Sequence, residues 1–108
     1  MKPTPLTISV DAGPDHTVRV RVEGELDLAT APELTDIIED QLGGGQHVIL
    51  DLSALEFIDS SGLQAILLAL KSADATSGTL RISSAIPSQV HRLLEIAGVL
   101  SSLPLIDD

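Results

Sequence analysis

The sequence predicts an α/β fold: a mixed sheet of four to five strands, with an N-terminal β-hairpin and about three helices packed on it. Two observations support this prediction. Apolar and polar residues alternate near the N-terminus, as strands with one buried face require. Further along, helical periods of apolar residues separate short apolar runs, an order typical of parallel strands joined by right-handed crossovers.

The N-terminal part of the sequence contains two alternating runs, residues 6–10 and residues 18–22. Between them lies DAGPDH, residues 11–16, which is rich in turn-forming residues. Two alternating runs joined by a turn predict an antiparallel hairpin with one face against the core.

A first helix is predicted where apolar residues recur with a helical period over residues 34–42. Thr30 followed by Glu33 predicts a capping box, in which each side chain binds the other's backbone N–H. Pro32 suits the first turn, and the glycines at 43–45 end the helix.

The middle of the sequence predicts a strand, a helix and a second strand. HVILDL, residues 47–52, is apolar almost without alternation, which predicts a central strand covered on both faces. A helical period then runs from Leu63 through Leu70 and ends at about Asp74. TLRIS, residues 79–83, is the next strand, so the two strands are expected to be parallel.

Pro87 opens a third predicted helix, which Gly98 closes. The expected inner face consists of apolar residues three or four positions apart: Val90, Leu93, Leu94 and Ala97. The remaining LSSLPLIDD allows one short edge strand.

Composition limits the possible functions. The 108 residues contain no linker or repeat, so we expect one domain over residues 1–108. Phe57 is the single aromatic residue, so the core must be built from aliphatic side chains. The sequence has no cysteine, which excludes disulfides and thiolate chemistry.

The net charge of −10 makes nucleic acid and anionic membranes poor partners. The N-terminus lacks the apolar core of a signal peptide, and no apolar run reaches the roughly 20 residues of a membrane span. We therefore expect a cytoplasmic protein.

Motifs for catalysis are weak. His16, His47 and His91 lack the spacing of a metal site, and we expect no metal or cofactor. The glycines at 43–45 lack the Lys that follows in a phosphate-binding loop. DSSGL also differs from the G-x-S-x-G pattern of hydrolases, so we expect no enzyme.

The segment FIDSSGLQ allows two interpretations. It is a plain helix start if Ser61 is the N-cap and forms a capping box with Gln64. That interpretation leaves Asp59, Ser60 and Gly62 unexplained. A site that another protein approaches closely would explain Gly62 and a free Ser60 hydroxyl together. We expect Gly62→Val to impair binding more than folding, and Ser60 to lie one residue outside the helix. The alternative is a helix boundary shifted by one residue, which would make Ser60 the cap.

Three segments of the sequence resemble the blocks of the STAS domain: VEGELDLATAPEL (22–34), VILDLSALEFIDSSGLQAIL (48–67) and LRISSAIPSQVHRLLEIAGV (80–99). The resemblance is greatest to the bacterial anti-sigma-factor antagonists. The middle block is the specific one, because it contains the Asp-Ser-Ser-Gly-Leu that marks the family.

The resemblance implies a binding module controlled by phosphorylation. Ser60 matches the serine that accepts phosphate from a partner that is both an anti-sigma factor and an ATP-dependent serine kinase. The unphosphorylated antagonist binds this kinase and releases the sigma factor, and a serine phosphatase reverses the modification. The expected contact residues lie at two helix starts at one end of the sheet: Asp27, Thr30, Asp59, Ser60, Ser61 and Gly62.

One departure from the family pattern affects the expected partners. Members usually continue into a final helix, whereas this sequence ends at LPLIDD. A missing helix would leave an apolar strip for a partner or for a second copy in a weak homodimer. The alternative function keeps the fold without the switch, as a scaffold or accessory subunit of a stress-signalling or lipid-transport complex.

Overall fold

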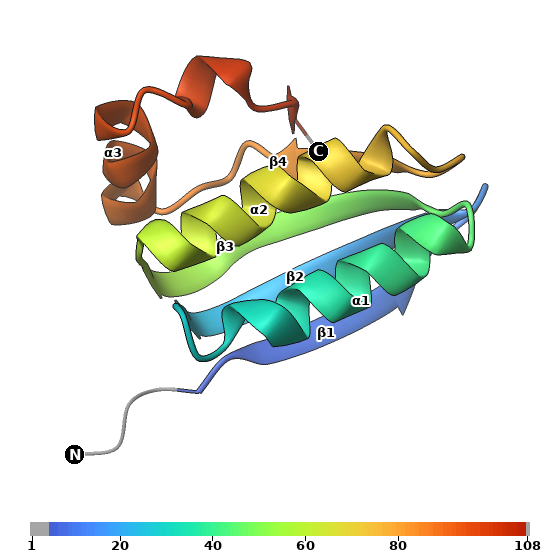
Figure 1. The fold of residues 1–108 in the computed structure, drawn as a ribbon, viewed down its shortest axis with the longest axis horizontal. Helices are drawn as coiled ribbons and strands as arrows, with labels where there is room; N and C mark the ends of the chain where they lie inside the picture. The colour runs from blue at the N-terminus through green and yellow to red at the C-terminus, as the bar shows by residue number, and fades with distance from the viewer. Residues whose placement is uncertain (1–4, 108) are drawn as a thin grey trace.

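The computed structural model describes residues 5–107 and confirms the α/β fold with its N-terminal hairpin (Figure 1). Its elements, in chain order, are β1 (Thr7–Ala12), β2 (Thr17–Leu26), α1 (Ala31–Gly43), β3 (His47–Ile58), α2 (Ser60–Ala73), β4 (Thr79–Ser83), α3 (Ser88–Ile96), the 3₁₀ helix η1 (Leu100–Ser102) and β5 (Leu105–Ile106).

The strands form one mixed sheet in the order β1-β2-β3-β4-β5. β1 and β2 are antiparallel, and their turn places Asp15 and His16 at φ 56° and 60°, the left-handed pair that favours tight hairpins. All other neighbouring strands are parallel. The predicted hairpin, the central position of β3, the parallel crossover and the short edge strand are therefore confirmed.

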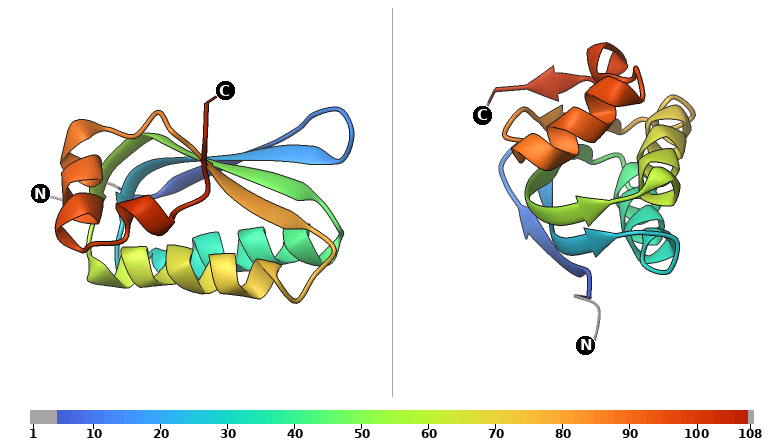
Figure 2. Two further views of the ribbon diagram at one scale, coloured as in Figure 1. Left: turned by 90° about the horizontal axis from the view of Figure 1, so that it is seen from above. Right: turned by 90° about the vertical axis from the view of Figure 1, so that its left-hand side faces the viewer.

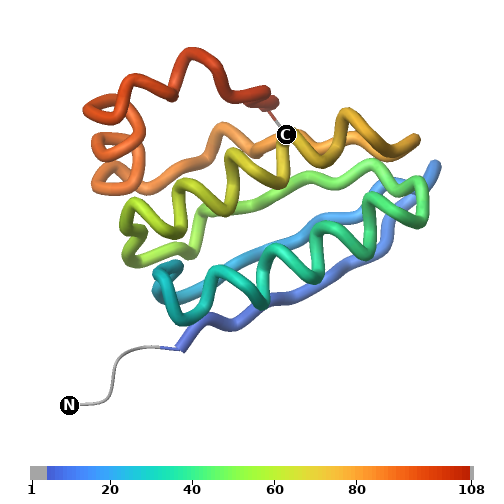
Figure 3. The backbone as a smooth tube through the Cα atoms, in the orientation of Figure 1, coloured from blue at the N-terminus to red at the C-terminus, as the bar shows by residue number. Residues whose placement is uncertain are grey.

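Helices α1 and α2 lie side by side over one face of the sheet (Figure 2). Each follows one of two parallel strands, so both helices begin at the same end of the sheet and run in the same direction (Figure 3). α3 packs at this end too, where Gln89 Nε2 donates a hydrogen bond to the Glu56 carbonyl oxygen (3.2 Å). Three helix starts therefore meet at one end of the molecule.

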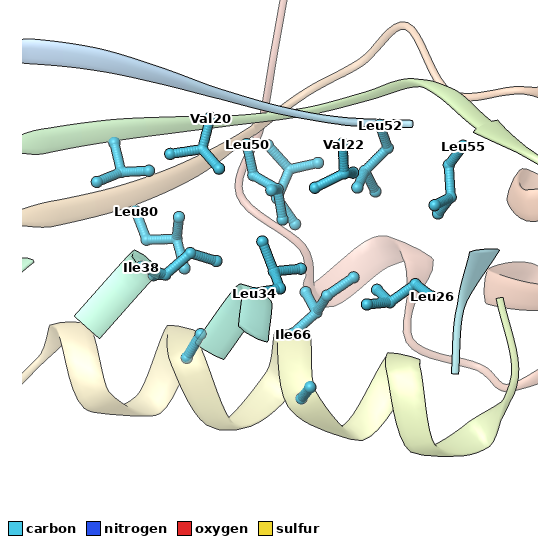
Figure 4. Packing of buried hydrophobic residues seen from close by; sticks show 14 of the residues in the cluster. Val20, Val22, Leu26, Leu34, Ile38, Leu50, Leu52, Leu55, Ile66 and Leu80 are labelled. Atoms are coloured by element: carbon cyan, nitrogen blue, oxygen red, sulfur yellow. The ribbon is translucent and has the colours of Figure 1, made fainter. Parts of the chain in front are cut away.

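The core between the sheet and the helices is aliphatic, as the composition predicts (Figure 4). Its fully buried members come from three strands, β2, β3 and β4, and from all three α-helices, and they include Val20, Val22, Leu34, Ile38, Leu50, Leu52, Ile66, Ile82 and Leu94. Truncating one of the leucines to Ala would cost about 2–5 kcal/mol.

β3 differs from its prediction in length and in cover. It continues to Ile58, well past the predicted end at Leu52, and it has helices on only one face. On the other face Ile49 is half-buried, and the prediction that both faces are covered is wrong. The alternation was hidden because Ile49 is apolar and the next outward residue, Asp51, is held by an ion pair.

Asp51 links β3 to β2 on the face without helices. Arg19 Nη1 and the Ser53 backbone N–H donate hydrogen bonds to its two carboxylate oxygens, each at 2.9 Å. Burial raises the pKa of Asp51, but these hydrogen bonds and the guanidinium charge together outweigh it and leave the pKa below its ordinary value.

The C-terminal third agrees with its prediction except at two places. Val90 and Leu94 are buried, and Gly98, at φ 74°, follows the end of α3. Ala97 was predicted on the inner face but is exposed, because the helix ends at Ile96 and the chain turns away. The 3₁₀ helix η1 was not predicted. Within residues 5–107, no helix is long and apolar enough to cross a membrane.

Candidate functional site

The two loops that follow β2 and β3 meet at one end of the sheet. Leu26 and Ile58 are paired at the ends of these parallel strands. Beyond the pair, the Asp59 backbone N–H donates a hydrogen bond to the Leu26 carbonyl oxygen (3.2 Å). This contact confirms that the helix starts after residues 26 and 58 lie side by side.

Asp59 is the N-cap of α2. It has an extended backbone, and its Oδ1 accepts a hydrogen bond from the Gly62 N–H at 2.9 Å. The predicted capping box between Ser61 and Gln64 is therefore wrong. An aspartate and a serine cap equally well, and Asp59 takes the position because β3 ends immediately before it.

Ser60 is the first residue of α2 and is exposed, not one residue outside the helix as predicted. Its hydroxyl makes no hydrogen bond to the described residues. Ser61, the next residue, is half-buried. The Ser60 hydroxyl is therefore the more accessible of the two, although for a different reason from the one the sequence suggested: Asp59 performs the capping.

Gly62 is buried beneath this surface. A Cβ atom at this position would lie 2.5 Å from the Leu26 carbonyl oxygen and 2.9 Å from Leu26 Cγ. Contacts this short require the backbone of the neighbouring loop to move. The expectation that a side chain at position 62 would spare folding is therefore wrong, because packing of the two helix starts requires the glycine.

The loop before α1 is held by Asp27 and Thr30. Asp27 Oδ1 accepts hydrogen bonds from the backbone N–H groups of Ala29 (3.0 Å) and Thr30 (3.1 Å). The Thr30 hydroxyl donates to the Glu25 carbonyl oxygen (2.8 Å) and accepts from the Asp27 N–H (3.0 Å). The loop is thus fastened by its own side chains.

The predicted capping box of Thr30 and Glu33 is absent. Thr30 already has helical backbone angles and makes no side-chain bond to the first turn of α1. The signal that sequence reasoning missed was Asp27, three residues earlier, whose carboxylate binds the backbone N–H groups at this start.

A shallow apolar groove runs between α1 and α2 from this end of the molecule. Its volume is about 360 Å³, and its lining includes Leu28, Ala31, Ser61, Ala65 and Leu68. Leu28 is 76 % exposed and Leu68 is 53 % exposed. Sequence reasoning did not identify the groove, because Leu28 continues the alternation of the strand before it, and a buried position was the natural expectation.

The chemistry available to these residues is limited. A nucleophilic serine needs a base within hydrogen-bond distance. In the described chain, the Ser60 hydroxyl has no such neighbour, and His91 instead lies 3.6 Å from Glu95 on α3. Among residues 5–107, no group of three or more His, Asp or Glu side chains is placed to hold a metal ion.

The position of Ser60 nevertheless suits a group that carries negative charge. The first N–H groups of a helix have no partner within the helix, and the helix dipole adds positive potential there. A phosphate on the Ser60 oxygen would lie beside these N–H groups. The start of α2 is therefore a favourable position for negative charge.

Known proteins share this fold and parts of this sequence. The model of the STAS domain family matches residues 9–108. An anti-sigma F factor antagonist from Paenibacillus polymyxa is 34 % identical over 91 residues, which cover 82 % of this chain and 77 % of the relative. The crystal structure of an anti-sigma factor antagonist from Mycobacterium paratuberculosis has a TM-score of 0.80 and 27 % identity, and the match covers 95 % of this chain and 86 % of that one.

The fold also matches the Bacillus cell fate determinant SpoIIAA in its phosphorylated form, with a TM-score of 0.70 over 94 % of this chain and 91 % of that one. The identity is 20 %, so this likeness concerns the fold alone. The family match extends over nearly the whole sequence and includes both helix starts. The chain therefore belongs to the STAS domain family.

Proposed function

We propose that this chain is an anti-sigma-factor antagonist that is switched by phosphorylation of Ser60. In its unphosphorylated form it binds an anti-sigma factor that is also an ATP-dependent serine kinase, and thereby releases a sigma factor. The observation that carries the proposal is the free, exposed Ser60 hydroxyl at the first position of α2, in a chain 34 % identical to an anti-sigma F factor antagonist.

The modification itself would be phosphoryl transfer from ATP. The Ser60 oxygen would attack the γ-phosphorus, and the bond from that phosphorus to the bridging oxygen of ADP would break. A base of the kinase would take the hydroxyl proton. This chain would contribute the acceptor hydroxyl and its position, and a separate serine phosphatase would hydrolyse the phosphoserine to reset the switch.

Accessibility supports Ser60 over Ser61 as the acceptor. Ser60 is exposed, whereas Ser61 is half-buried and lines the groove between α1 and α2. A kinase must surround the acceptor oxygen with its own groups, which requires a side chain that stands clear of its neighbours.

The electrostatic effect of the phosphate explains the switch. The phosphate adds about −1.5 to −2 charge next to the Asp59 carboxylate. In the complex it would occupy the place where the kinase holds the phosphates of its nucleotide, so like charges would repel. A buried unpaired charge costs several kcal/mol, and each 1.4 kcal/mol lowers affinity about tenfold.

The proposed contact surface includes Asp27, Thr30, Asp59 and Ser61 around Ser60. The hydrogen bonds of Asp27, Thr30 and Asp59 to the backbone keep both loops in place. A rigid surface loses little conformational entropy on binding. Because ATP and sigma factors act in the cytoplasm, the proposal places the chain there.

Mass spectrometry tests the proposal directly. The purified chain is incubated with ATP and each purified anti-sigma-factor kinase of the source organism, and the intact mass is measured. We expect a gain of one phosphate in the wild type and in Ser61→Ala, but none in Ser60→Ala. Fragmentation should place the phosphate on Ser60.

Binding provides the second readout. Ser60→Ala should bind the kinase with or without ATP, whereas Ser60→Asp should bind at least about tenfold more weakly. Phosphate mainly on Ser61, or Ser60→Asp bound as tightly as wild type, would contradict the switch. A chain that no such kinase modifies would favour the scaffold function instead.

A further inference from the structure

We infer that the groove between α1 and α2 is the primary docking site for the kinase, and that it receives an apolar side chain flanked by Lys or Arg residues. This inference rests on the proposed function and adds to it. Phosphorylation takes place at the first residue of α2, whereas the groove provides an apolar contact surface with an acidic residue beside it.

The shape of the groove indicates a protein partner. Leu28 stands at its end near Ser60, and Leu68 lies about two turns along α2, so apolar surface extends for about 12 Å. Small ligands bind in enclosed pockets, whereas Leu28 is largely exposed. A shallow apolar groove beside exposed leucines fits a side chain carried by another protein.

The charges beside the groove indicate that this partner is basic. α1 carries four exposed acidic residues and no Lys or Arg: Glu33, Asp36, Glu39 and Asp40. Of these four, only Asp36 lines the groove, and the others are elsewhere on the exposed surface of α1. Such a surface attracts a partner of opposite charge and repels others.

The basic residues of the described chain lie mainly elsewhere. Arg19, Arg21 and Arg81 alternate along β2 and β4 with residues that are buried under the helices, so they belong to the opposite face of the sheet. Lys71 is in the last turn of α2, one turn beyond Leu68 and away from Ser60, and Arg92 is on α3. The helix face therefore carries more acidic than basic residues, whereas Arg19 and Arg21 on the opposite face are paired with Asp51 and Glu23.

The same charges argue against a second copy as the occupant. Two copies that pair through this groove would bring the acidic residues of α1 against each other, and each chain carries a net charge of −10. Like charges across such an interface are repulsive. The complementary surface must therefore come from a different protein.

The groove and the switch occupy different parts of the surface. Asp36 lies about 8 Å along α1 from its first residue, whereas Ser60 is at the very start of α2. A basic group that pairs with Asp36 is therefore not placed to neutralise a phosphate on Ser60. The interface with the kinase can therefore include a basic surface of the kinase beside Asp36 and still be disrupted by a phosphate on Ser60.

Two leucine variants with a matched control test the apolar part. The measured quantity is the affinity for the kinase that modifies the wild type in the mass experiment. We expect Leu28→Ser and Leu68→Ser each to weaken binding about tenfold or more. Ile96→Ser is the control, because Ile96 is 74 % exposed but lies on α3. Its affinity should stay within about twofold of wild type.

A charge pair tests the acidic part. Asp36→Lys and Glu95→Lys change the net charge equally, but only Asp36 lines the groove. We expect Asp36→Lys to weaken binding about tenfold and to reduce its dependence on salt, since a nearby attractive pair is lost. Glu95→Lys should change the affinity by no more than about threefold.

The outcomes separate the docking site from the switch. If both leucine variants bind like Ile96→Ser while Ser60→Asp loses the kinase, the groove is not the docking site, and the phosphorylation switch remains supported. If no kinase phosphorylates Ser60, the proposed function fails, and this inference fails with it. Sedimentation of the wild type alone should give a monomer, and a dimer lost in Leu68→Ser would assign the groove to a second copy instead.

Discussion

The starts of α1 and α2 are built alike but use their hydroxyl groups differently. Each follows the end of a parallel strand, and in each an aspartate binds the backbone N–H groups of the turn. At α1, however, the Thr30 hydroxyl makes hydrogen bonds to Glu25 and Asp27. At α2, the Ser60 hydroxyl makes none within the described chain.

The difference shows that two hydroxyl groups in similar positions can have different roles. One makes hydrogen bonds within the fold, and the other remains accessible to another protein. Thr30 holds its loop, so removing its hydroxyl breaks contacts of the folded state. Ser60 is free because Asp59 already caps the helix, so we expect a change at its hydroxyl to cost little stability. The Ser60 hydroxyl is therefore accessible because the neighbouring Asp59 caps the helix.

Stability should depend most strongly on Gly62, where the two helix starts touch. Gly62→Ala should lower the free energy of unfolding by about 1–3 kcal/mol, because the new Cβ would meet the Leu26 carbonyl oxygen at 2.5 Å. Gly43→Ala is the matched control, since a Cβ there has no heavy atom of the described chain within 4 Å. It should be neutral or stabilise by up to about 1 kcal/mol.

Urea unfolding of both variants checks this pair. Equal stabilities for Gly62→Ala and wild type would mean that the two loops can separate easily. The two helix starts would then keep their similar structures without close contact between them.

The next effect compares the two hydroxyl groups directly. Thr30→Val keeps the shape of the side chain but leaves the Asp27 N–H without its acceptor, and we expect a loss of about 1–2 kcal/mol. Ser60→Ala should change the free energy of unfolding by less than about 0.5 kcal/mol. Thermal melting of the two variants measures the difference, and equal losses would show that Ser60 also has a structural role.

A smaller effect is expected at the cap of α2. Asp59→Ala should destabilise by about 1 kcal/mol, because the Gly62 N–H loses its acceptor. Asp59→Asn retains an acceptor oxygen and should remain within about 0.5 kcal/mol of wild type. If Asp59→Ala were as stable as Asp59→Asn, Ser60 or Ser61 would be able to replace the cap.

A negative charge at Ser60 should change the stability of the fold only slightly. The helix dipole favours Ser60→Asp by about 0.3–1 kcal/mol, and repulsion from Asp59 offsets part of this gain. We therefore expect a stability within about 0.5 kcal/mol of wild type, and the difference should shrink at high salt. Denaturation at low and high salt measures it, and a larger loss would mean that phosphate acts by unfolding α2.

Much of the fold could be predicted because each element has its own local pattern. The alternation in β2 and the helical period of α1 and α2 identify these elements without knowledge of their neighbours. The order of strand, helix and strand then leaves parallel pairing as the expected arrangement.

The details of the site could not be predicted in this way, because they depend on contacts between distant residues. Asp59 and Ser61 are equally good N-caps, so the choice between them depends on where β3 ends. The hydrogen bond from the Asp59 N–H to the Leu26 carbonyl oxygen determines that point. Gly62 is required because Leu26 lies against it. The groove needs the relative placement of two helices, which no local pattern contains.

If Ser60 is the phosphorylation site proposed above, the hydrogen bond between Asp59 and Leu26 would also make its modification depend on folding. The two loops are far apart in the sequence and come together only when β2 and β3 pair. A kinase that contacts both loops recognises a surface that the unfolded chain lacks. Modification of Ser60 would then report that the antagonist has finished folding, and immature chains would not draw the anti-sigma factor away from its sigma factor.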